Sequence, residues 1–387
     1  MIPRLALPPS PAALALIAAA FALPGLAGHD LWKTHDAIGL GIVHDMATAG
    51  SLLVPGIAGT PWLYDPPLYH WLALLFGRSL QWAIEFHSGA RLASGVLILL
   101  AFWLIYLAAR DWARAQELEA YDQGEHTGFL RHLVVREGRN TSQVLIQLVT
   151  APGKLDAESF VSALTRFPEV RSIHWSINER PAEVTNLPTQ LLHGDEAIEE
   201  ELCGLRFRVR PNAFLQTNTA MAERLYELAF EYAALTGSET VYDLYCGIGT
   251  IGLSMAARAL TVWGVEVSEE SVACALENAD LNGITNAAFF AGNVGQALEE
   301  LRERAGAPDV VVVDPPRAGL AGKALRRVGR LGAPRLVYVS CNPTTLASDV
   351  KALAGEYGYR LDRARPVDMF PHTPHIETVA FLERSDR

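Results

Sequence analysis

The stretch Val-Tyr-Asp-Leu-Tyr-Cys-Gly-Ile-Gly-Thr-Ile-Gly at residues 241–252 decides the fold. A hydrophobic strand runs into two closely spaced glycines, Gly247 and Gly249, and a helix pattern begins directly after them. Glycines at such a turn let the backbone approach a ligand that a side chain would exclude. Nineteen residues after Gly247, a second predicted strand ends in Glu266, whose carboxylate can accept both hydroxyls of a ribose. The spacing predicts a strand–turn–helix unit that binds a nucleoside cofactor.

The turn favours S-adenosylmethionine over a dinucleotide or ATP. It lacks the full Gly-x-Gly-x-x-Gly pattern and the Lys-Ser/Thr pair that holds phosphate. Asp243 would repel a pyrophosphate, whereas S-adenosylmethionine carries a cation and no phosphate. Strand and helix patterns alternate from Val241 to the end of the chain, which predicts a doubly wound parallel sheet.

A further hydrophobic strand delivers a thiol to a strand end. The segment Val-Tyr-Val-Ser-Cys-Asn-Pro at 337–343 contains Cys341, and Pro343 stops the strand. Loops at the carboxyl ends of strands carry the chemistry of an open α/β sheet. A thiol there can act as a nucleophile if its pKa is lowered. Taken alone, Cys341 is better explained as a small buried hydrophobe, but the surrounding motifs favour a nucleophile.

Two more loops complete the predicted site. The strand Val310–Val313 runs into Asp-Pro-Pro-Arg, where the prolines would hold the carboxylate of Asp314 and the guanidinium of Arg317 in place. The segment His-Thr-Pro-His-Ile-Glu at 372–377 places two histidines and Glu377 before the last predicted strand. Related Asp-Pro-Pro loops hold the target amine in amino-methyltransferases, so amine methylation is an alternative chemistry.

Five motifs occur in one order along the chain: Phe214-Leu-Gln-Thr-Asn, Asp-Leu-Tyr-Cys-Gly, Asp-Pro-Pro-Arg-Ala-Gly, Ser-Cys-Asn-Pro-Thr-Thr-Leu and His-Thr-Pro-His-Ile-Glu. In these motifs, residues from about 117 to 387 resemble the RNA uracil-5-methyltransferases, notably the bacterial 23S ribosomal RNA type. The resemblance implies an S-adenosylmethionine-dependent methyltransferase with a Rossmann-like sheet. It implies methylation of carbon 5 of uridine in RNA, with 23S ribosomal RNA favoured and transfer RNA as the other candidate.

The resemblance also assigns roles to residues. Cys341 would be the nucleophile and Glu377 the base. The residues that it implies for contact with S-adenosylmethionine are Gln216, Tyr245, Glu266 and Asp314. Carbon 5 of uracil attacks a methyl group only after a thiolate adds at carbon 6, and a base must then remove the carbon-5 proton. Arg317 would stabilise the developing enolate or hold a phosphate, and the sequence leaves both roles open. The target base must leave its stack to reach such a pocket.

Net charge and cysteine content limit which partners and metal groups the sequence is compatible with. The net charge of −11 argues mildly against a nucleic-acid partner, although local basic patches can override it. The four cysteines form no Cys-x-x-Cys pair and have no zinc-like spacing to histidines. Family members of the ribosomal type usually carry an N-terminal β-barrel and a cysteine-ligated iron–sulfur cluster, and no iron–sulfur cluster is expected here. Candidate RNA contacts are His126, Arg131, Arg136, Arg206, Arg208, Arg210 and the basic segment 323–330, with a solvated charged face as the alternative for each. His372 and His375 could shape the base pocket or make packing hydrogen bonds within their loop.

Three domains are predicted. Residues 1–115 form a hydrophobic, membrane-like segment with two predicted transmembrane helices at about 12–28 and 90–109. The first of these could instead be a signal peptide. Residues 116–204 read as a small α/β subdomain and 205–387 as the catalytic domain. Arginines flank both spans and place these flanks in the cytoplasm, so a cytoplasmic, monomeric methyltransferase is expected, tethered to the inner membrane if the spans are genuine.

Residues 1–110 carry a resemblance of their own. The segments His-Asp at 35–36 and Trp-Leu-Tyr-Asp-Pro-Pro-Leu-Tyr-His-Trp at 62–71 resemble the amino-terminal part of lipid-linked-sugar glycosyltransferases of the protein-mannosyltransferase type. In that family an acidic residue in the first outer loop serves catalysis, and Asp36 would match it. A fragment of a membrane glycosyltransferase is therefore the second alternative.

Overall fold

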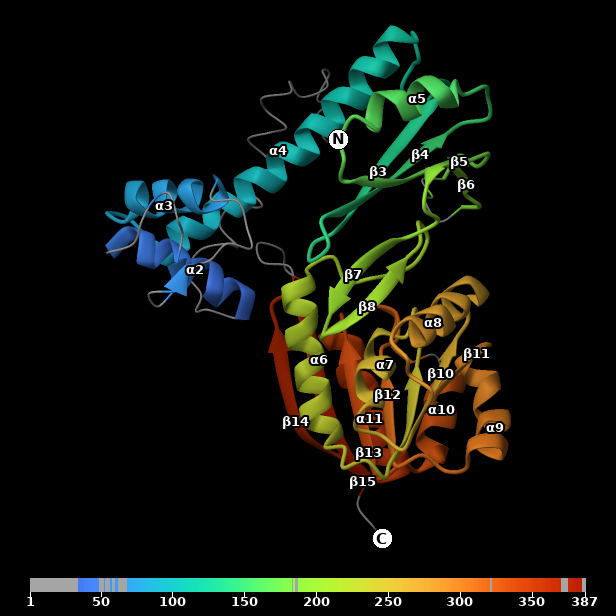
Figure 1. The fold of residues 1–387 in the computed structure, drawn as a ribbon. Helices are drawn as coiled ribbons and strands as arrows, with labels where there is room; N and C mark the ends of the chain where they lie inside the picture. The colour runs from blue at the N-terminus through green and yellow to red at the C-terminus, as the bar shows by residue number, and fades with distance from the viewer. Residues whose placement is uncertain are drawn as a thin grey trace, which may run out of the picture. The chain divides into compact units, whose positions relative to one another are not determined.

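The computed structural model describes residues 34–48, 52, 56–57, 60–61, 68–182, 184, 187–320, 322–369 and 375–384 (Figure 1). The chain divides into two compact units, Met1–Ala115 and Gln116–Arg387. The chemistry-bearing motifs all lie in the second unit.

The first unit is helical where it is described. Its elements are α2 (Thr34–Thr48), β1 (Gly56–Ile57), β2 (Thr60–Pro61), α3 (Leu68–Leu80) and α4 (Phe86–Ala115). Buried side chains of α2, α3 and the start of α4, among them Val43, Leu74 and Ala90, form its core. Within the described residues, α4 is the helix long and apolar enough to cross a membrane, with a mean hydropathy of 2.4 in its most apolar window. It contains the predicted span 90–109.

Two other predictions for this unit concern its beginning. The predicted span 12–28 lies outside the described residues. Asp36, predicted in the loop between the two spans, lies in helix α2.

A small mixed sheet opens the second unit. Its strands, in spatial order, are β3 (Leu130–Gly138), β4 (Gln143–Thr150), β5 (Val170–Ile177) and β6 (Gln190–Gly194), and helix α5 (Ala157–Leu164) connects β4 to β5. The Asp156 side chain caps α5 by accepting from the backbone N–H of Ser159. Leu145, Phe160 and Ile173 are fully buried. Residues 116–204 were predicted as a small α/β subdomain, and this sheet and helix lie within them.

A hairpin follows the small sheet. It consists of β7 (Ile198–Leu202) and β8 (Leu205–Val209), joined by a two-residue turn in which Cys203 and Gly204 have φ values of 53° and 76°. Positive φ at both positions is the conformation that tight hairpin turns require. The predicted boundary between 204 and 205 falls at the end of this turn.

The large sheet has seven strands. In spatial order they are β11 (Ala287–Ala291), β10 (Thr261–Glu266), β9 (Thr240–Leu244), β12 (Val310–Val313), β13 (Arg335–Ser340), β15 (Glu377–Arg384) and β14 (Tyr359–Val367). The first five are parallel, as predicted, whereas β15 is antiparallel to both β13 and β14. The predicted parallel order was wrong at this edge, because the connection 368–376 is too short for the crossover that parallel strands need.

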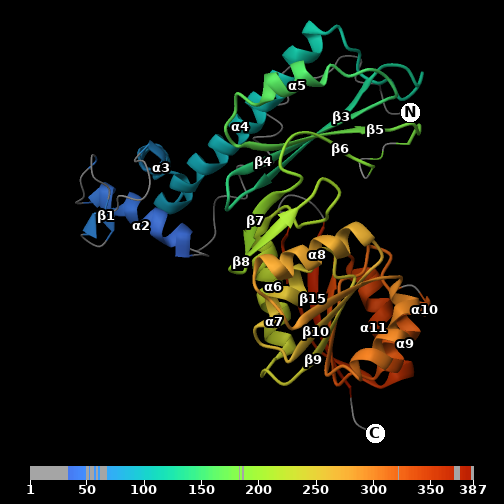
Figure 2. The ribbon, with the colours of Figure 1, turned by 45° about the vertical axis from the view of Figure 1, so that its right-hand side comes forward.

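Helices cover both faces of the large sheet, as Figure 2 shows. On one face lie α6 (Thr219–Ala233), α7 (Thr250–Ala256) and α8 (Glu269–Leu281), and on the other α9 (Val294–Ala305), α10 (Gly322–Leu331) and α11 (Pro343–Tyr357). The central strands are therefore buried on both sides, which explains the uninterrupted valines of β12. Strand order reverses between β9 and β12, so the loops that follow these two strands meet at the point where such sheets bind ligands.

Candidate active site

The glycine turn after β9 has the backbone geometry of a ligand-binding loop. Tyr245, Gly247 and Gly249 have φ values of 66°, 55° and 84°. Left-handed backbone is unusual for a tyrosine and marks a loop held in place by its surroundings. The backbone N–H groups of Tyr245 and Cys246 both donate to the carbonyl of Val265, at 2.9 and 3.2 Å, which ties the loop to β10. A Cβ atom added at Gly247 would meet nothing within 4 Å, so this part of the loop borders open space.

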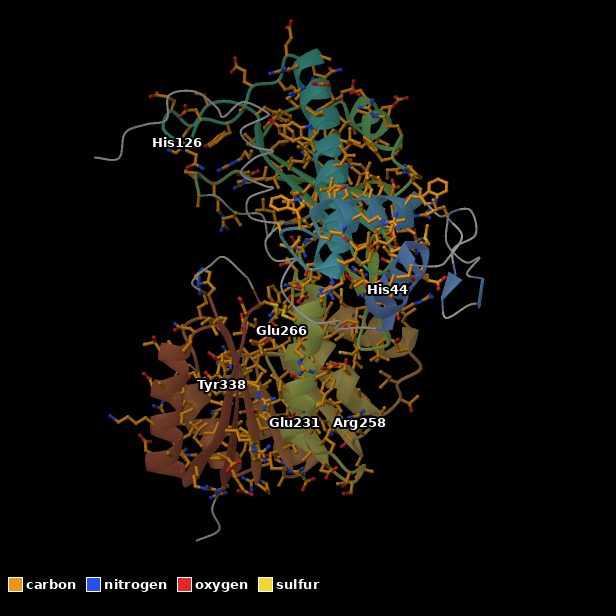
Figure 3. All side chains as sticks on the ribbon, turned by 90° about the vertical axis from the view of Figure 1, so that its left-hand side faces the viewer. His44, His126, Glu231, Arg258, Glu266 and Tyr338 are labelled. Carbon is orange, nitrogen blue, oxygen red and sulfur yellow. The ribbon has the colours of Figure 1, made fainter. Side chains whose placement is uncertain are left out.

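Glu266 ends β10 beside this turn and is labelled in Figure 3. Its Oε2 accepts from the backbone N–H of Gly247 at 3.1 Å, and its Oε1 accepts from that of Ser268 at 3.0 Å. Each carboxylate oxygen has two lone pairs, so each can accept one more hydrogen bond. The side chain is thus fixed from the protein side while two adjacent acceptors remain, the arrangement that a vicinal diol such as a ribose requires.

Asp243 supports the loop from within the fold. It is 1% exposed, and its Oδ2 accepts from the backbone N–H of Gly252 at 2.8 Å. Burial, with the Glu266 carboxylate acting in the same direction, raises the pKa of Asp243 to about 7. Its Oδ1 is buried without a hydrogen-bond partner among the described residues. Asp243 therefore fixes the start of α7, which is a different role from the repulsion of pyrophosphate that the sequence suggested.

Tyr245 lies in the turn itself, whereas Gln216 lies on a different segment. Tyr245 is half-buried, and burial together with the carboxylates of Asp349 and Glu266 raises its pKa. Gln216 lies between β8 and α6 and is 8% exposed, and its amide makes no hydrogen bond to the described residues. The Gln216 segment is anchored on one side by Arg136, whose Nη1 donates to the carbonyl of Ala213 at 2.6 Å. The small sheet thereby fixes a predicted cofactor contact of the large one.

The loop after β12 is held at both of its ends. The Asp314 backbone N–H donates to the carbonyl of Leu244 at 3.2 Å, which joins it to the cofactor strand. At the far end, the Leu320 backbone N–H donates to Oδ2 of Asp349 at 2.8 Å, and the hydroxyl of Tyr338 donates to the same oxygen at 2.6 Å. Tyr338 is fully buried in β13 (Figure 3). Asp349 thus clamps this loop onto the sheet.

Asp314 and Arg317 present opposite charges from this loop. Burial raises the pKa of Asp314 to about 8, with the carboxylates of Glu377 and Asp243 acting in the same direction. Arg317 is exposed, and its Nη2 donates to Nδ1 of His375 at 2.7 Å. Its charge lowers the pKa of Glu377, but burial of Glu377 is the larger effect and raises that pKa.

Cys341 and Glu377 face each other across two strands. The last backbone pair of β13 and β15 is Ser340 with Thr378, and Cys341 and Glu377 are the next residues on the two strands. Burial, followed by the carboxylates of Glu377 and Asp314, raises the pKa of the Cys341 thiol, while Arg317 acts in the lowering direction. This direction is opposite to the lowered pKa that a reactive thiol needs, because burial disfavours the thiolate and the two carboxylates add to that effect.

The structure therefore brings six of the seven predicted site residues into two adjoining groups. Tyr245 and Glu266 surround the glycine turn, and the second group consists of Cys341, Glu377, Asp314 and Arg317. Gln216 lies on a separate segment, between β8 and α6. His372 lies outside the described residues.

Three predicted RNA contacts are engaged within the fold. The guanidinium of Arg131 donates to the carbonyls of Asn178, Arg180, Pro181 and Ala182 and lies 4.1 Å from the Tyr121 ring centroid. Arg136 holds the Gln216 segment, as described above. Arg210 pairs with Glu277 at 2.8 Å. These side chains are engaged within the fold because long-range folding brings carbonyls and carboxylates to them. Helix α10, by contrast, exposes Lys323, Arg326 and Arg330.

Sequence reasoning missed several residues of the site. Asn342 and Thr345 donate to the Arg317 carbonyl at 3.0 and 3.3 Å, and Asp349 clamps the same loop. Phe214 is 67% exposed two residues before Gln216, as a stacking platform for a base would be. The Asn342-Pro343 pair was a readable signal for a helix cap, since proline favours the first helical position.

Among the described residues, no group of three or more His, Cys, Asp or Glu side chains could hold a metal ion.

This chain is similar in sequence to known RNA methyltransferases. An uncharacterized RNA methyltransferase of Enterococcus faecalis is 44% identical over 279 residues, which are 71% of this chain and 61% of that protein. An uncharacterized RNA methyltransferase of Clostridium tetani is 40% identical over 284 residues, covering 72% of this chain and 61% of that protein. The chain thus spans about 61% of the length of these curated relatives.

A solved structure supports the fold. The crystal structure of Pyrococcus abyssi tRNA (uracil-54, C5)-methyltransferase in complex with S-adenosyl-L-homocysteine is similar, with a TM-score of 0.62 and 32% identity. The match covers 72% of this chain and 66% of that chain. The family model described as tRNA (uracil-5-)-methyltransferase matches residues 189–385, which include the glycine turn, the Asp314 loop, Cys341 and Glu377. With half of its length in this match and its site residues within it, the chain belongs to the tRNA (uracil-5-)-methyltransferase family.

Proposed function

We propose that this protein methylates carbon 5 of a uridine in RNA through a covalent bond between Cys341 and carbon 6 of the base. The observation that carries the proposal is the placement of Cys341 opposite Glu377, with Asp314 linking that pair to the cofactor turn. A thiol and a carboxyl base next to a nucleoside site are the groups that this reaction requires.

The residues around the glycine turn fit S-adenosylmethionine. Glu266 offers two fixed acceptors for ribose hydroxyls, Gly247 borders open space, and the site contains several carboxyl groups that favour a cationic ligand. Gln216, Tyr245, Glu266 and Asp314 are the residues that would hold this cofactor. When bound, S-adenosylmethionine supplies a methyl group on a positively charged sulfur.

The chain's own residues account for the other steps. The deprotonated sulfur of Cys341 adds to carbon 6, and the electrons of the carbon 5–carbon 6 double bond move toward the carbonyl oxygen at carbon 4. Arg317 is the positively charged side chain that acts on Cys341 and Glu377, and it would stabilise that oxygen. After carbon 5 has gained a methyl group, Glu377 takes its remaining proton. The electrons of that C–H bond restore the double bond and expel the Cys341 thiolate.

Two RNAs are candidates for the substrate, 23S ribosomal RNA and transfer RNA. The sequence motifs favour 23S ribosomal RNA, whereas the family model and the Pyrococcus abyssi enzyme are named for transfer RNA. Exposed Phe214 offers an aromatic face for an unstacked base, and the exposed cations of α10 suit a phosphate backbone. Both features would serve either RNA, and transfer of a labelled methyl group to each RNA distinguishes them.

Two assays test the proposal. The full chain is incubated with 5-fluorouridine RNA and S-adenosylmethionine, since fluorine at carbon 5 prevents proton removal and traps the adduct. A covalent complex that disappears in Cys341→Ala supports the mechanism, and its absence in the unaltered chain refutes it. Transfer of a labelled methyl group to unmodified 23S ribosomal RNA or transfer RNA identifies the substrate. Methylation of an amine that survives Cys341→Ala would favour the alternative amino-methyltransferase chemistry.

The first unit supports a location at a bilayer. Helix α4 exposes large apolar side chains along its length, and Arg110 and Arg114 follow its apolar part. These side chains are Leu97, Leu100, Phe102, Leu104 and Tyr106. The methyltransferase unit would then act in the cytoplasm at the inner membrane. Pelleting of the full chain with membranes after carbonate washing supports this location, and recovery in the supernatant contradicts it.

A further inference from the structure

The loop that carries Arg317 is fastened to the segment that carries Cys341. The backbone carbonyl of Arg317 accepts a hydrogen bond from Nδ2 of Asn342 at 3.0 Å and lies 3.3 Å from Oγ1 of Thr345, whose single proton it shares with the Asn342 carbonyl at 3.1 Å. Thr345 lies in the first turn of α11, which begins two residues after Cys341, and Asn342 is the residue that caps this helix. Two side-chain donors on one carbonyl fix the position of the Arg317 backbone relative to the thiol.

Asn342 also fixes the backbone at the thiol itself. Its Oδ1 accepts from the backbone N–H of Thr344 at 3.1 Å and so caps α11. Its own backbone N–H donates to Oγ of Ser340 at 3.1 Å, and the Ser340 hydroxyl donates to the Asn342 carbonyl at 3.1 Å. The side-chain amide of Asn342 thus has two roles. Its oxygen caps α11 where the chain passes from strand to helix, and its nitrogen holds the Arg317 loop.

The position of Arg317 matters because of the charges around the sulfur. Glu377 from β15 and Asp314 from the end of β12 raise the pKa of Cys341, and Arg317 is the side chain that acts in the opposite direction. Arg317 also acts in the lowering direction on the pKa of Glu377. The side chain is exposed and contacts His375. Coulomb interactions weaken with distance, so displacement of Arg317 would weaken its effect on the thiol.

We infer that Asn342 and Thr345 are positioning residues that hold Arg317 against the Cys341–Glu377 pair. This inference rests on the proposed function only in taking Cys341 as the nucleophile. The two residues touch neither substrate nor cofactor in this role, since they act through the Arg317 backbone. They fix the backbone from which the Arg317 guanidinium extends, and the position of this cation is one of the influences on the fraction of thiolate at neutral pH.

The chain offers variants that separate the two purposes of Asn342. In Asn342→Ser the side chain still caps α11, because serine is a favoured cap, but it is too short to reach the Arg317 carbonyl. Thr345→Val removes the second donor at nearly constant shape, and Thr345→Ser retains it. Thr344→Val is the matched control, because Thr344 lies in the same turn, is exposed, and its hydroxyl has no hydrogen-bond partner among the described residues.

The measurement is the rate of Cys341 alkylation by iodoacetamide as a function of pH, followed on the peptide that contains Cys341. It needs neither RNA nor turnover, so it is informative even if the proposed methylation fails. Asn342→Ser and Thr345→Val should each lower the rate at pH 7 by about three- to ten-fold and move the profile to higher pH, since one pKa unit corresponds to ten-fold. Thr345→Ser and Thr344→Val should match the unaltered chain.

A double-variant cycle distinguishes positioning from general loosening of the structure. Arg317→Ala should lower the alkylation rate at least as much as either variant, and adding Asn342→Ser or Thr345→Val to it should change nothing further. If these variants reduce the rate equally with and without Arg317, the inference is overturned. If Asn342→Ser fails to fold, as thermal unfolding would reveal, Thr345→Val decides the same question. If the unaltered chain methylates no RNA but the alkylation rates still depend on Arg317 in this way, the proposed function is refuted and this inference stands.

Discussion

Cys341 and Glu377 are the first residues beyond the Ser340–Thr378 backbone pair of antiparallel strands β13 and β15. Residues directly opposite each other on antiparallel strands point to the same face of the sheet. The proximity is electrostatic as well, because the Glu377 carboxylate raises the pKa of the thiol. A nucleophile and a base in this relationship can act on neighbouring carbons of one ring, which is the requirement at carbons 5 and 6 of uracil.

The first prediction follows from the separate roles of these two residues. Glu377→Gln should still form the covalent bond to carbon 6 but should fail to remove the carbon-5 proton. A complex with ordinary uridine RNA should therefore accumulate, and turnover should fall by about 10²- to 10⁴-fold. Denaturing electrophoresis detects the complex, and labelled methyl transfer measures turnover.

Glu383→Gln is the matched control for this variant. It makes the same chemical change near the other end of β15, where the side chain is exposed. It should leave turnover unchanged. Turnover at the normal rate in Glu377→Gln would remove this residue from the role of base.

The second prediction concerns Glu266 and the cofactor. Glu266→Gln replaces one of two acceptors with a donor, so one ribose hydroxyl loses its partner. Binding of S-adenosylhomocysteine should weaken by about ten- to one-hundred-fold, as expected when a hydrogen bond to a charged group is lost. Isothermal titration calorimetry measures this, and exposed Glu269→Gln provides the comparison. Equal affinities in the two variants would argue against a ribose at Glu266.

How far the sequence predicts this site depends on the range of the interactions involved. The turn at 245–249 and the thiol at the end of β13 were predictable because a strand pattern leads directly into each of them. The capping and clamping residues were not predictable as such. Asn342 lies 25 residues from Arg317, and Asn218, whose Nδ2 donates to the Met369 carbonyl at 3.0 Å, lies 151 residues from its partner. Such pairs exist only once the sheet has formed.

Charged segments show a different limit of sequence reasoning. Glu199, Glu200 and Glu201 are three consecutive acidic residues, yet Glu200 is 1% exposed because alternate residues of a strand point to opposite sides. Strand β14 carries Arg360, Arg363 and Arg365, and its polar sequence fits the exposed edge of a sheet, where it was not recognised. Net charge likewise gave no indication that Arg131 would be surrounded by backbone carbonyls.

The third prediction concerns pH. Asp243 and Asp314 have pKa values raised from 3.8 to about 7 and about 8. A cationic sulfonium favours their ionised forms, whereas neutral S-adenosylhomocysteine has no such charge. Affinity for S-adenosylmethionine should therefore rise between pH 6 and pH 8.5 relative to that for S-adenosylhomocysteine. Calorimetry in buffers of different ionisation enthalpy should show proton release only with the sulfonium ligand, and equal pH profiles for both ligands would contradict the prediction.

The same two groups determine a trend in stability without ligand. The folded protein retains protons on Asp243 and Asp314 that the unfolded chain has already released above its ordinary pKa of 3.8. The unfolded state thus binds fewer protons, so this contribution to the free energy of unfolding decreases as pH rises from about 4 to about 8. Asp314→Asn should flatten the upper part of this trend in denaturant titrations. A trend equally steep in Asp314→Asn and in the unaltered chain would assign it to other groups.

The last prediction tests how the small sheet is joined to the catalytic one. The Glu200 carboxylate accepts from the backbone N–H groups of Arg139, Asn140 and Glu201 at 2.8, 3.0 and 2.8 Å, and from the Thr219 hydroxyl at 2.9 Å. These donors come from the β3–β4 turn, from β7 and from the start of α6. Glu200→Gln turns one acceptor into a donor that faces other donors, so the free energy of unfolding should fall by about 1–3 kcal/mol. Glu201→Gln is the control, because the Glu201 side chain is exposed, and it should change the free energy of unfolding by less than about 0.5 kcal/mol. Urea titrations compare the two variants, and equal midpoints would show that Glu200 does not fasten these segments together.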